Sequence, residues 1–161
     1  MLILFILLGV ATAVYLTLCT RWDLKEREIY TFPSIILSGL WMIFATIDKS
    51  YSITYISLFF MAHSLFYLAC NHFKLWGGGD SDMLSLLAGM SLGVGLQLDA
   101  VWMCIAQCLM LAIVLVLAFI VALIESVIKK KPLSKGSKVA LAPGFAVVSV
   151  LLLIGGVWLR W

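Results

Sequence analysis

Apolar segments long enough to cross a lipid bilayer follow one another along almost the whole chain. A helix that spans the hydrocarbon core needs about 20 residues, and six candidate segments approach or exceed that length. They are Met1–Cys19, Pro33–Ile47, Ile53–Phe73, Met83–Leu98, Ala100–Ile128 and Val139–Trp161. Because 64% of the 161 residues are hydrophobic and 12% are charged, a soluble globule of this size has no way to bury its apolar surface. The sequence therefore predicts an integral membrane protein.

The six segments are uniformly apolar and do not alternate polar with apolar residues, which favours helices over a β-barrel. We therefore expect an all-α, polytopic membrane helix bundle, with residues 1–161 forming a single transmembrane domain. The connections are short except at Thr20–Phe32 and Lys129–Lys138. The first segment is expected to be retained. Although Ala11-Thr12-Ala13 resembles a signal-peptide cleavage site, no basic residue precedes the apolar run, which continues to Cys19.

Basic residues are shared unevenly between the two sets of connections. The odd-numbered connections carry nine of the eleven: Arg21, Lys25, Arg27, Lys74, Lys129, Lys130, Lys131, Lys135 and Lys138. Since Lys and Arg mark the cytoplasmic side, both chain termini are predicted to lie outside. We interpret the lysine run at 129–131 as a topology anchor, and the net charge of +3 as no indication of a nucleic-acid partner.

The stretch Trp76–Asp82, between the third and fourth segments, combines three glycines with two acids. Glycine lets the backbone adopt turns that other residues avoid, and an acid at membrane depth is costly and often functional. Asp80 is also well placed to be the N-cap of the fourth segment. That structural role explains Asp80, but it does not explain three glycines and the second acid, Asp82.

Asp23 follows the first segment by a few residues and stands beside Trp22, whose indole is expected at the headgroup level. The predicted orientation brings Asp23 to the cytoplasmic face together with Asp80. A competing interpretation is an ordinary interfacial acid that pairs with Arg27, four residues further on. We expect Lys25–Glu28 to form a solvated interfacial loop or the frayed start of a helix.

Three further features predict packing. Small residues recur every four positions in the fourth segment and form a ridge that permits close helix approach: Ser81, Ser85, Gly89 and Gly93. Pro143 and Gly144 predict a kink or a broken first turn in the sixth segment, close to the cytoplasmic face. Glu125 lies one turn before Lys129 and is expected to be its partner.

Histidine and cysteine side chains do not suggest a metal site. His63 and His72 have no acidic or cysteine partners at ligand spacing, and the four cysteines form no CxxC pair. We expect these side chains to pack between helices, and we predict neither a metal nor an organic cofactor.

Together the two aspartate stretches resemble the motifs of the prepilin peptidases of type IV pilus, type II secretion and tight-adherence systems, and above all the short, peptidase-only members of that family. Asp23-Leu24-Lys25-Glu26-Arg27-Glu28-Ile29 is similar to the family's first motif, an Asp followed by a basic stretch and Ile-Pro-Asn. Gly77-Gly78-Gly79-Asp80 resembles its second motif, GxGD. Ala142-Pro143-Gly144-Phe145 is similar to a Pro-containing stretch that opens the family's last helix. The resemblance covers nearly the whole chain in span number, orientation and motif order.

Two positions depart from the family pattern. Tyr30-Thr31 stands where the family usually has Pro-Asn, and Asp82 stands where a Lys commonly follows GxGD. The second departure replaces a positive charge by a negative one, and we expect it to raise the cost of ionising Asp80.

The resemblance implies a membrane-embedded aspartic endopeptidase of a bacterial or archaeal cytoplasmic membrane, cleaving the basic leader from prepilins or pseudopilins at the cytoplasmic face. It implies that Asp23 and Asp80 are catalytic and that the backbone of Gly77, Gly78 and Gly79 binds substrate. Larger relatives carry a cytoplasmic segment with paired CxxC motifs; we see neither that segment nor a methyl-donor site, and expect no methyltransferase activity. The expected partners are the substrate and the lipid bilayer.

Two other functions compete. In a non-catalytic membrane scaffold or small transporter, the glycine turn is a hinge and the acids are helix caps. An intramembrane protease of the presenilin kind also carries GxGD, but its first aspartate lies well inside a span, commonly after Tyr, whereas Asp23 follows Trp22 near the end of an apolar segment.

Overall fold

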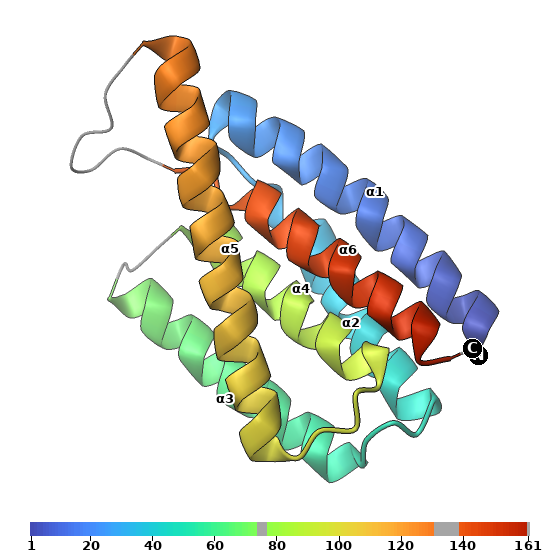
Figure 1. Cartoon of the computed structure of the whole chain (residues 1–161). Coiled ribbons are helices and arrows are strands. Elements are labelled where there is room, and N and C mark those ends of the chain that lie inside the picture. Colours follow the sequence, from blue (N-terminus) through green and yellow to red (C-terminus); the bar gives the residue numbers. More distant parts are fainter. Residues whose placement is uncertain (74–76, 131–138, 161) are drawn as a thin grey trace.

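The structure is a computed structural model that describes residues 1–73, 77–130 and 139–160. Within these residues the chain forms six helices: α1 (Leu2–Glu26), α2 (Thr31–Ile47), α3 (Ile53–His72), α4 (Gly78–Val94), α5 (Ala100–Lys129) and α6 (Ala142–Trp158). Successive helices run in opposite directions along one bundle, and the two chain termini lie side by side at one end (Figure 1). We call this the termini end, and the opposite end, where α1 finishes and α4 begins, the aspartate end.

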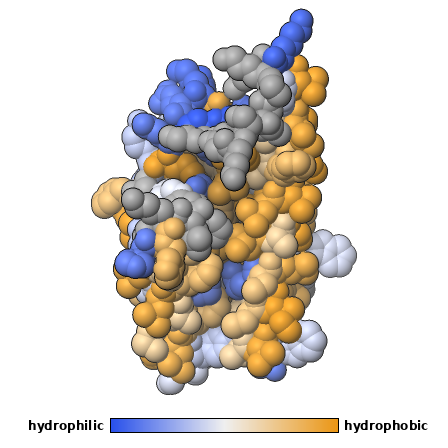
Figure 2. All heavy atoms as spheres, turned by 90° about the vertical axis from the view of Figure 1, so that its left-hand side faces the viewer, coloured by the Kyte–Doolittle hydropathy of each residue, from blue (hydrophilic) through white to orange (hydrophobic). Residues whose placement is uncertain are grey.

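Three helices are long and apolar enough to cross a membrane, namely α1, α3 and α5, while α2 and α6 contribute shorter apolar helices. Large apolar side chains cover the outside of the bundle; Leu7, Leu109 and Phe119, for example, are each more than half exposed. Figure 2 shows hydrophobic atoms over most of the length of one face, with hydrophilic atoms gathered mainly at its upper end. A soluble monomer rarely exposes so much contiguous apolar surface. The predicted all-helical class is therefore confirmed for the described residues, and the apolar exterior is typical of a membrane protein.

Helix α4 lies at the centre of the bundle, and nearly all its residues from Ser81 to Val94 are buried. The ridge of small residues predicted on α4 faces α2. A Cβ atom added at Gly89 would lie 2.9 Å from the Ser38 carbonyl oxygen, and one at Gly93 would lie 2.2 Å from Cε3 of Trp41. Ser38 Oγ also donates to the Ser85 carbonyl oxygen at 2.9 Å. The small residues therefore allow α2 to approach α4 more closely than larger side chains would permit.

An aromatic cluster and one arginine hold the termini end together. The Phe5 and Trp41 rings meet edge to face, with centroids 5.3 Å apart. The Arg160 guanidinium lies 4.4 Å from the Phe5 ring centroid and donates to the carbonyl oxygens of Gly93 and Val94 at the end of α4, both at 2.7 Å. Arg160 thereby joins the end of α6 to the end of α4.

The helix boundaries differ from the predicted segments in three places. Helix α1 continues through the charged residues to Glu26, because Lys, Arg and Glu are good helix formers even where apolar periodicity has ended; Lys25 and Glu26 are therefore its last turn and not a loop. Helix α4 begins at Gly78, five residues before the predicted start, and ends at Val94. Pro143 occupies the first turn of α6, where proline needs no N–H partner, so it starts this helix and does not break it. Most of the predicted Lys129–Lys138 connection lies outside the described residues.

Candidate active site

Asp23 lies in the last turn of α1 and is 5% exposed. Its Oδ2 accepts a hydrogen bond from the backbone N–H of Ala142, the first residue of α6, at 2.9 Å. The unpaired amides at the start of a helix favour a negative group, so this contact fixes the carboxylate against α6. The structure thus places Asp23 inside the bundle and not at its solvated rim.

Arg27 does not pair with Asp23 as the interfacial interpretation predicted. Its Nη2 donates to Oε2 of Glu125 near the end of α5. The predicted pairing of Glu125 with Lys129 goes untested, because the Lys129 side chain lies outside the described residues. Arg27 adopts the left-handed conformation, with φ of 57°, that ends α1. The Arg27–Glu125 ion pair therefore closes one side of the Asp23 site, and no spacing rule in the sequence indicates it.

Asp80 lies in the first turn of α4, two residues after the start of the helix. The prediction that it is the N-cap is wrong, because Gly77 occupies that position. Asp80 nevertheless completes the cap from within the helix: its Oδ2 accepts the Gly77 N–H at 3.2 Å, while its own N–H donates to the Gly77 carbonyl oxygen at 3.1 Å. The carboxyl group is thereby held at the helix start.

Burial and the nearby negative charge of Asp23 raise the pKa of Asp80 to about 6, against the opposing effect of the Gly77 N–H. Asp80 precedes the apolar part of α4, at the aspartate end, so the two carboxyl groups lie at the same end of the bundle, and the charge of Asp23 acts on Asp80. Like charges brought together in this way separate their proton affinities, so that the pair retains one proton over a range of pH.

The three glycines before Asp80 have different surroundings. A Cβ atom at Gly79 would lie 2.8 Å from the Cβ atom of Ile29, at the end of the first aspartate stretch. Gly77 uses its N–H for Asp80. Around Gly78 a Cβ atom would meet nothing within 4 Å, and this residue is exposed. Of the glycines predicted to bind substrate, Gly78 therefore has the most open surroundings, while Gly79 joins the two aspartate stretches.

Asp82 points away from this pair. It is 5% exposed and its carboxyl group forms a hydrogen bond with Tyr67 of α3. It lines a separate cavity of about 510 Å³ between α2, α3 and α4, together with Ser38 and Ser64. Burial and the charge of Asp23 account for the raised pKa of Asp80; the expected effect of Asp82 on that ionisation stays a prediction.

Among the described residues, no group of three or more His, Cys, Asp or Glu side chains lies close enough to hold a metal ion. At the aspartate end the described residues place two carboxyl groups beside an ion pair. No family model, curated protein or solved structure matches this chain.

Proposed function

We propose that this protein is a membrane-embedded aspartic endopeptidase that removes the basic leader from type IV prepilins or pseudopilins. In this proposal all six helices cross a bacterial or archaeal cytoplasmic membrane, both termini lie outside, and the aspartate end faces the cytoplasm. The observation that carries the proposal is that Asp23 and Asp80, which come from helices far apart in the sequence, lie at the same end of the bundle, where the charge of Asp23 raises the pKa of Asp80. The resemblance of their two stretches to the prepilin peptidase motifs supports the same function.

Two carboxyl groups that share one proton can hydrolyse a peptide bond without a metal. The proton belongs to the pair of Asp23 and Asp80 and not to either residue alone. The charged carboxylate takes a proton from water as the water oxygen attacks the scissile carbonyl carbon, and the protonated carboxyl group donates its proton to the carbonyl oxygen. When the tetrahedral intermediate collapses, the first carboxyl group passes the proton that it took to the leaving amine. One hydroxyl group of the intermediate returns its proton to the second carboxylate as the carbonyl re-forms, so the pair again holds one proton.

The substrate class follows from the resemblance and from the surface around the pair. A prepilin presents a short basic leader, a Gly at the cleavage point and then an apolar helix. Glu26 and Glu28 are exposed beside the aspartate end and attract a basic leader, whereas buried Asp82 does not contribute. The open backbone at Gly78 leaves room for an extended cleavage segment.

One observation favours the competing non-catalytic scaffold or small transporter. Both carboxylates accept an N–H from the start of a helix, Asp23 from Ala142 and Asp80 from Gly77, and a capping role alone explains such contacts. Catalysis and capping must therefore be separated by experiment.

Replacing each acid by its amide achieves that separation, because the side-chain oxygen of Asn can still accept the amide N–H. We expect Asp23→Asn and Asp80→Asn each to abolish processing of a co-expressed prepilin while protein levels stay unchanged. Full processing by either variant would refute the catalytic pair.

The matched controls are Asp82→Asn and Asp99→Asn. Asp99 is the N-cap of α5 at the termini end, where its Oδ1 accepts the Trp102 N–H at 2.9 Å. Both controls should retain most of the processing. Equal losses in all four variants would indicate general destabilisation and support the scaffold.

A further inference from the structure

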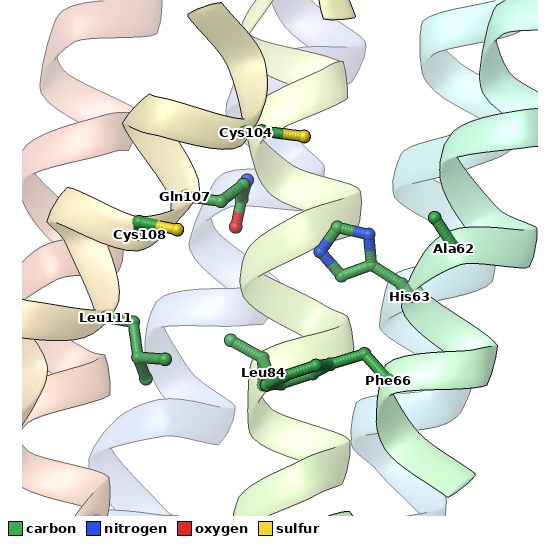
Figure 3. A pocket seen from close by; sticks show the side chains of 8 residues that line it. All are labelled: Ala62, His63, Phe66, Leu84, Cys104, Gln107, Cys108 and Leu111. Carbon is green, nitrogen blue, oxygen red and sulfur yellow. The ribbon is translucent and has the colours of Figure 1, made fainter. Parts of the chain in front are cut away.

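A cavity of about 200 Å³ lies between α3, α4 and α5, and neither Asp23 nor Asp80 lines it. It is lined by Ala62, His63, Phe66, Leu84, Cys104, Gln107, Cys108 and Leu111 (Figure 3). Cys104 and Cys108 are exposed on the outside of the bundle, so the cavity opens toward the surrounding bilayer. His63 lies at the middle of the apolar span in α3, which places the cavity near the centre of the membrane.

Gln107 presents a buried acceptor to this cavity. The side chain is 8% exposed, and its Nε2 donates to Ser91 Oγ. Ser91 Oγ donates its single proton to the Ala88 carbonyl oxygen at 2.8 Å, so it can only accept from Gln107. This chain of bonds fixes the amide orientation and turns Oε1 away from Ser91. Gln107 Oε1 is buried without a hydrogen-bond partner in the described part of the chain, a state that costs free energy unless a ligand supplies a donor.

His63 presents a second acceptor. Its Nδ1 lies 3.1 Å from the Phe59 carbonyl oxygen, and since a carbonyl only accepts, Nδ1 carries the proton. A charged imidazolium is costly inside an apolar span, so the ring is neutral and its Nε2 has a free lone pair. Figure 3 shows the His63 ring and the Gln107 amide extending into the same space from opposite sides.

We propose that this cavity binds the ring of a membrane-dissolved hydroquinone, whose two hydroxyl groups donate to Gln107 Oε1 and His63 Nε2. The remaining walls are apolar and include the Phe66 ring, which suits an aromatic body. A glycerol ester also carries two hydroxyl groups, but it keeps them at the headgroup level and not at the depth of His63. The cavity holds only the ring, so the hydrocarbon chain of the ligand lies in the bilayer past Cys104 and Cys108.

The site selects the reduced form of the ligand. A quinone offers only carbonyl acceptors, which cannot pair with two protein acceptors, whereas the hydroquinone offers two donors. The dimethyl ether of the hydroquinone has the same shape but no donor, and is therefore the matched control ligand.

Cys104 and Cys108 report occupancy directly. The full chain is reconstituted in lipid nanodiscs, and labelling by a lipid-soluble maleimide is followed residue by residue by mass spectrometry. The probe is trimethyl-decylhydroquinone, kept reduced, whose fully substituted ring cannot add to thiols. Buried Cys19 and Cys70 serve as internal references for an intact fold. We expect the hydroquinone to slow labelling of Cys104 and Cys108. To give the same degree of protection, the dimethyl ether and the quinone should need concentrations at least about fivefold higher.

Two variants test the acceptors. Gln107→Leu and His63→Phe should each raise the half-protecting hydroquinone concentration about fivefold, while Thr17→Val, on the exposed side of α1, should not. Equal protection by hydroquinone and dimethyl ether, no protection by either, or protection by monodecanoylglycerol alone would each overturn the proposal. Because neither aspartate lines the cavity, Asp80→Asn should bind the probe unchanged, so the outcome is independent of the peptidase proposal.

Discussion

Gly79 and Ile29 touch backbone to side chain: a Cβ atom at Gly79 would lie 2.8 Å from the Cβ atom of Ile29 and 3.4 Å from its Cγ2. These residues belong to two stretches about 50 positions apart in the sequence, each of which carries one aspartate of the candidate pair. Their contact holds the start of α4 against the segment that follows α1. The glycine of the second motif thus acts as a spacer that lets Asp80 approach Asp23.

Adding a methyl group at Gly79 should therefore separate the pair. We expect Gly79→Ala to abolish most prepilin processing and to destabilise the protein by about 1–3 kcal/mol, the usual cost of overpacking, less the small gain in helix propensity. Processing assays and denaturant unfolding in detergent measure the two effects.

Gly78→Ala is the matched control for stability, because a Cβ atom there meets no other atom of the chain within 4 Å; its free energy of unfolding should be unchanged or slightly higher. Ile29→Gly combined with Gly79→Ala should restore processing, whereas Ile29→Ala should not, because the clashing atom is Cβ itself. Wild-type processing by Gly79→Ala alone would contradict the spacer role.

The sequence predicts the number and approximate positions of the helices because apolar length dominates that signal. It also predicts that the ridge from Ser81 to Gly93 packs closely against a neighbour. It does not indicate that this neighbour is α2, that Arg27 reaches Glu125, or that Asp82 turns toward Tyr67. Each of these depends on which helices become adjacent, and six apolar segments of similar composition leave that choice open.

Asp80 should make the stability of the protein depend on pH. Its pKa of about 6 lies above the ordinary value of 3.8, so the folded state binds this proton more tightly than the unfolded state. The contribution of Asp80 is therefore most favourable below pH 3.8, declines as the pH rises toward about 6, and is constant above. We expect Asp80→Asn to be more stable than the parent by about 1–2 kcal/mol at about pH 8, a value reduced because the carboxyl is partly exposed. The difference should vanish near pH 3.8, and unfolding at both pH values measures it.

The peptidase activity should fall on the alkaline side of about pH 6. The free enzyme loses the shared proton there, so kcat/KM should decrease about tenfold for each further pH unit, with an apparent pKa that belongs to the pair. In Asp82→Asn, kcat/KM should begin to decrease at the same pH as in the parent, because the charge of Asp23 is the one that acts on Asp80. A decrease in kcat/KM that is displaced by a full pH unit in Asp82→Asn would show that Asp82 belongs to the site.

The ion pair between Arg27 and Glu125 should show measurable coupling. Its side chains are 24% and 19% exposed, so the charges are less screened than those of Lys25 and Glu26, which are 74% and 43% exposed. In double-mutant cycles with Gln at each position, we expect a coupling of about 1–2 kcal/mol for Arg27–Glu125 and no more than about 0.5 kcal/mol for Lys25–Glu26. Equal coupling energies in the two cycles would exclude a special role for Arg27.

Arg160 should be the residue that contributes most to the stability of the termini end. Its guanidinium donates to Asp48 at 2.8 Å and to the last carbonyl oxygens of α4, a set of bonds that needs the planar fork of arginine. We expect Arg160→Met to lower the free energy of unfolding by about 2–3 kcal/mol, because it leaves the half-buried Asp48 charge unpaired. Arg160→Lys keeps the charge but not the fork and should recover less than half of the loss. The double variant Arg160→Met with Asp48→Leu removes both charges and should recover most of the lost free energy of unfolding. A double variant as unstable as Arg160→Met would mean that the contacts with the α4 carbonyl oxygens, and not the ion pair, contribute most of the stabilisation.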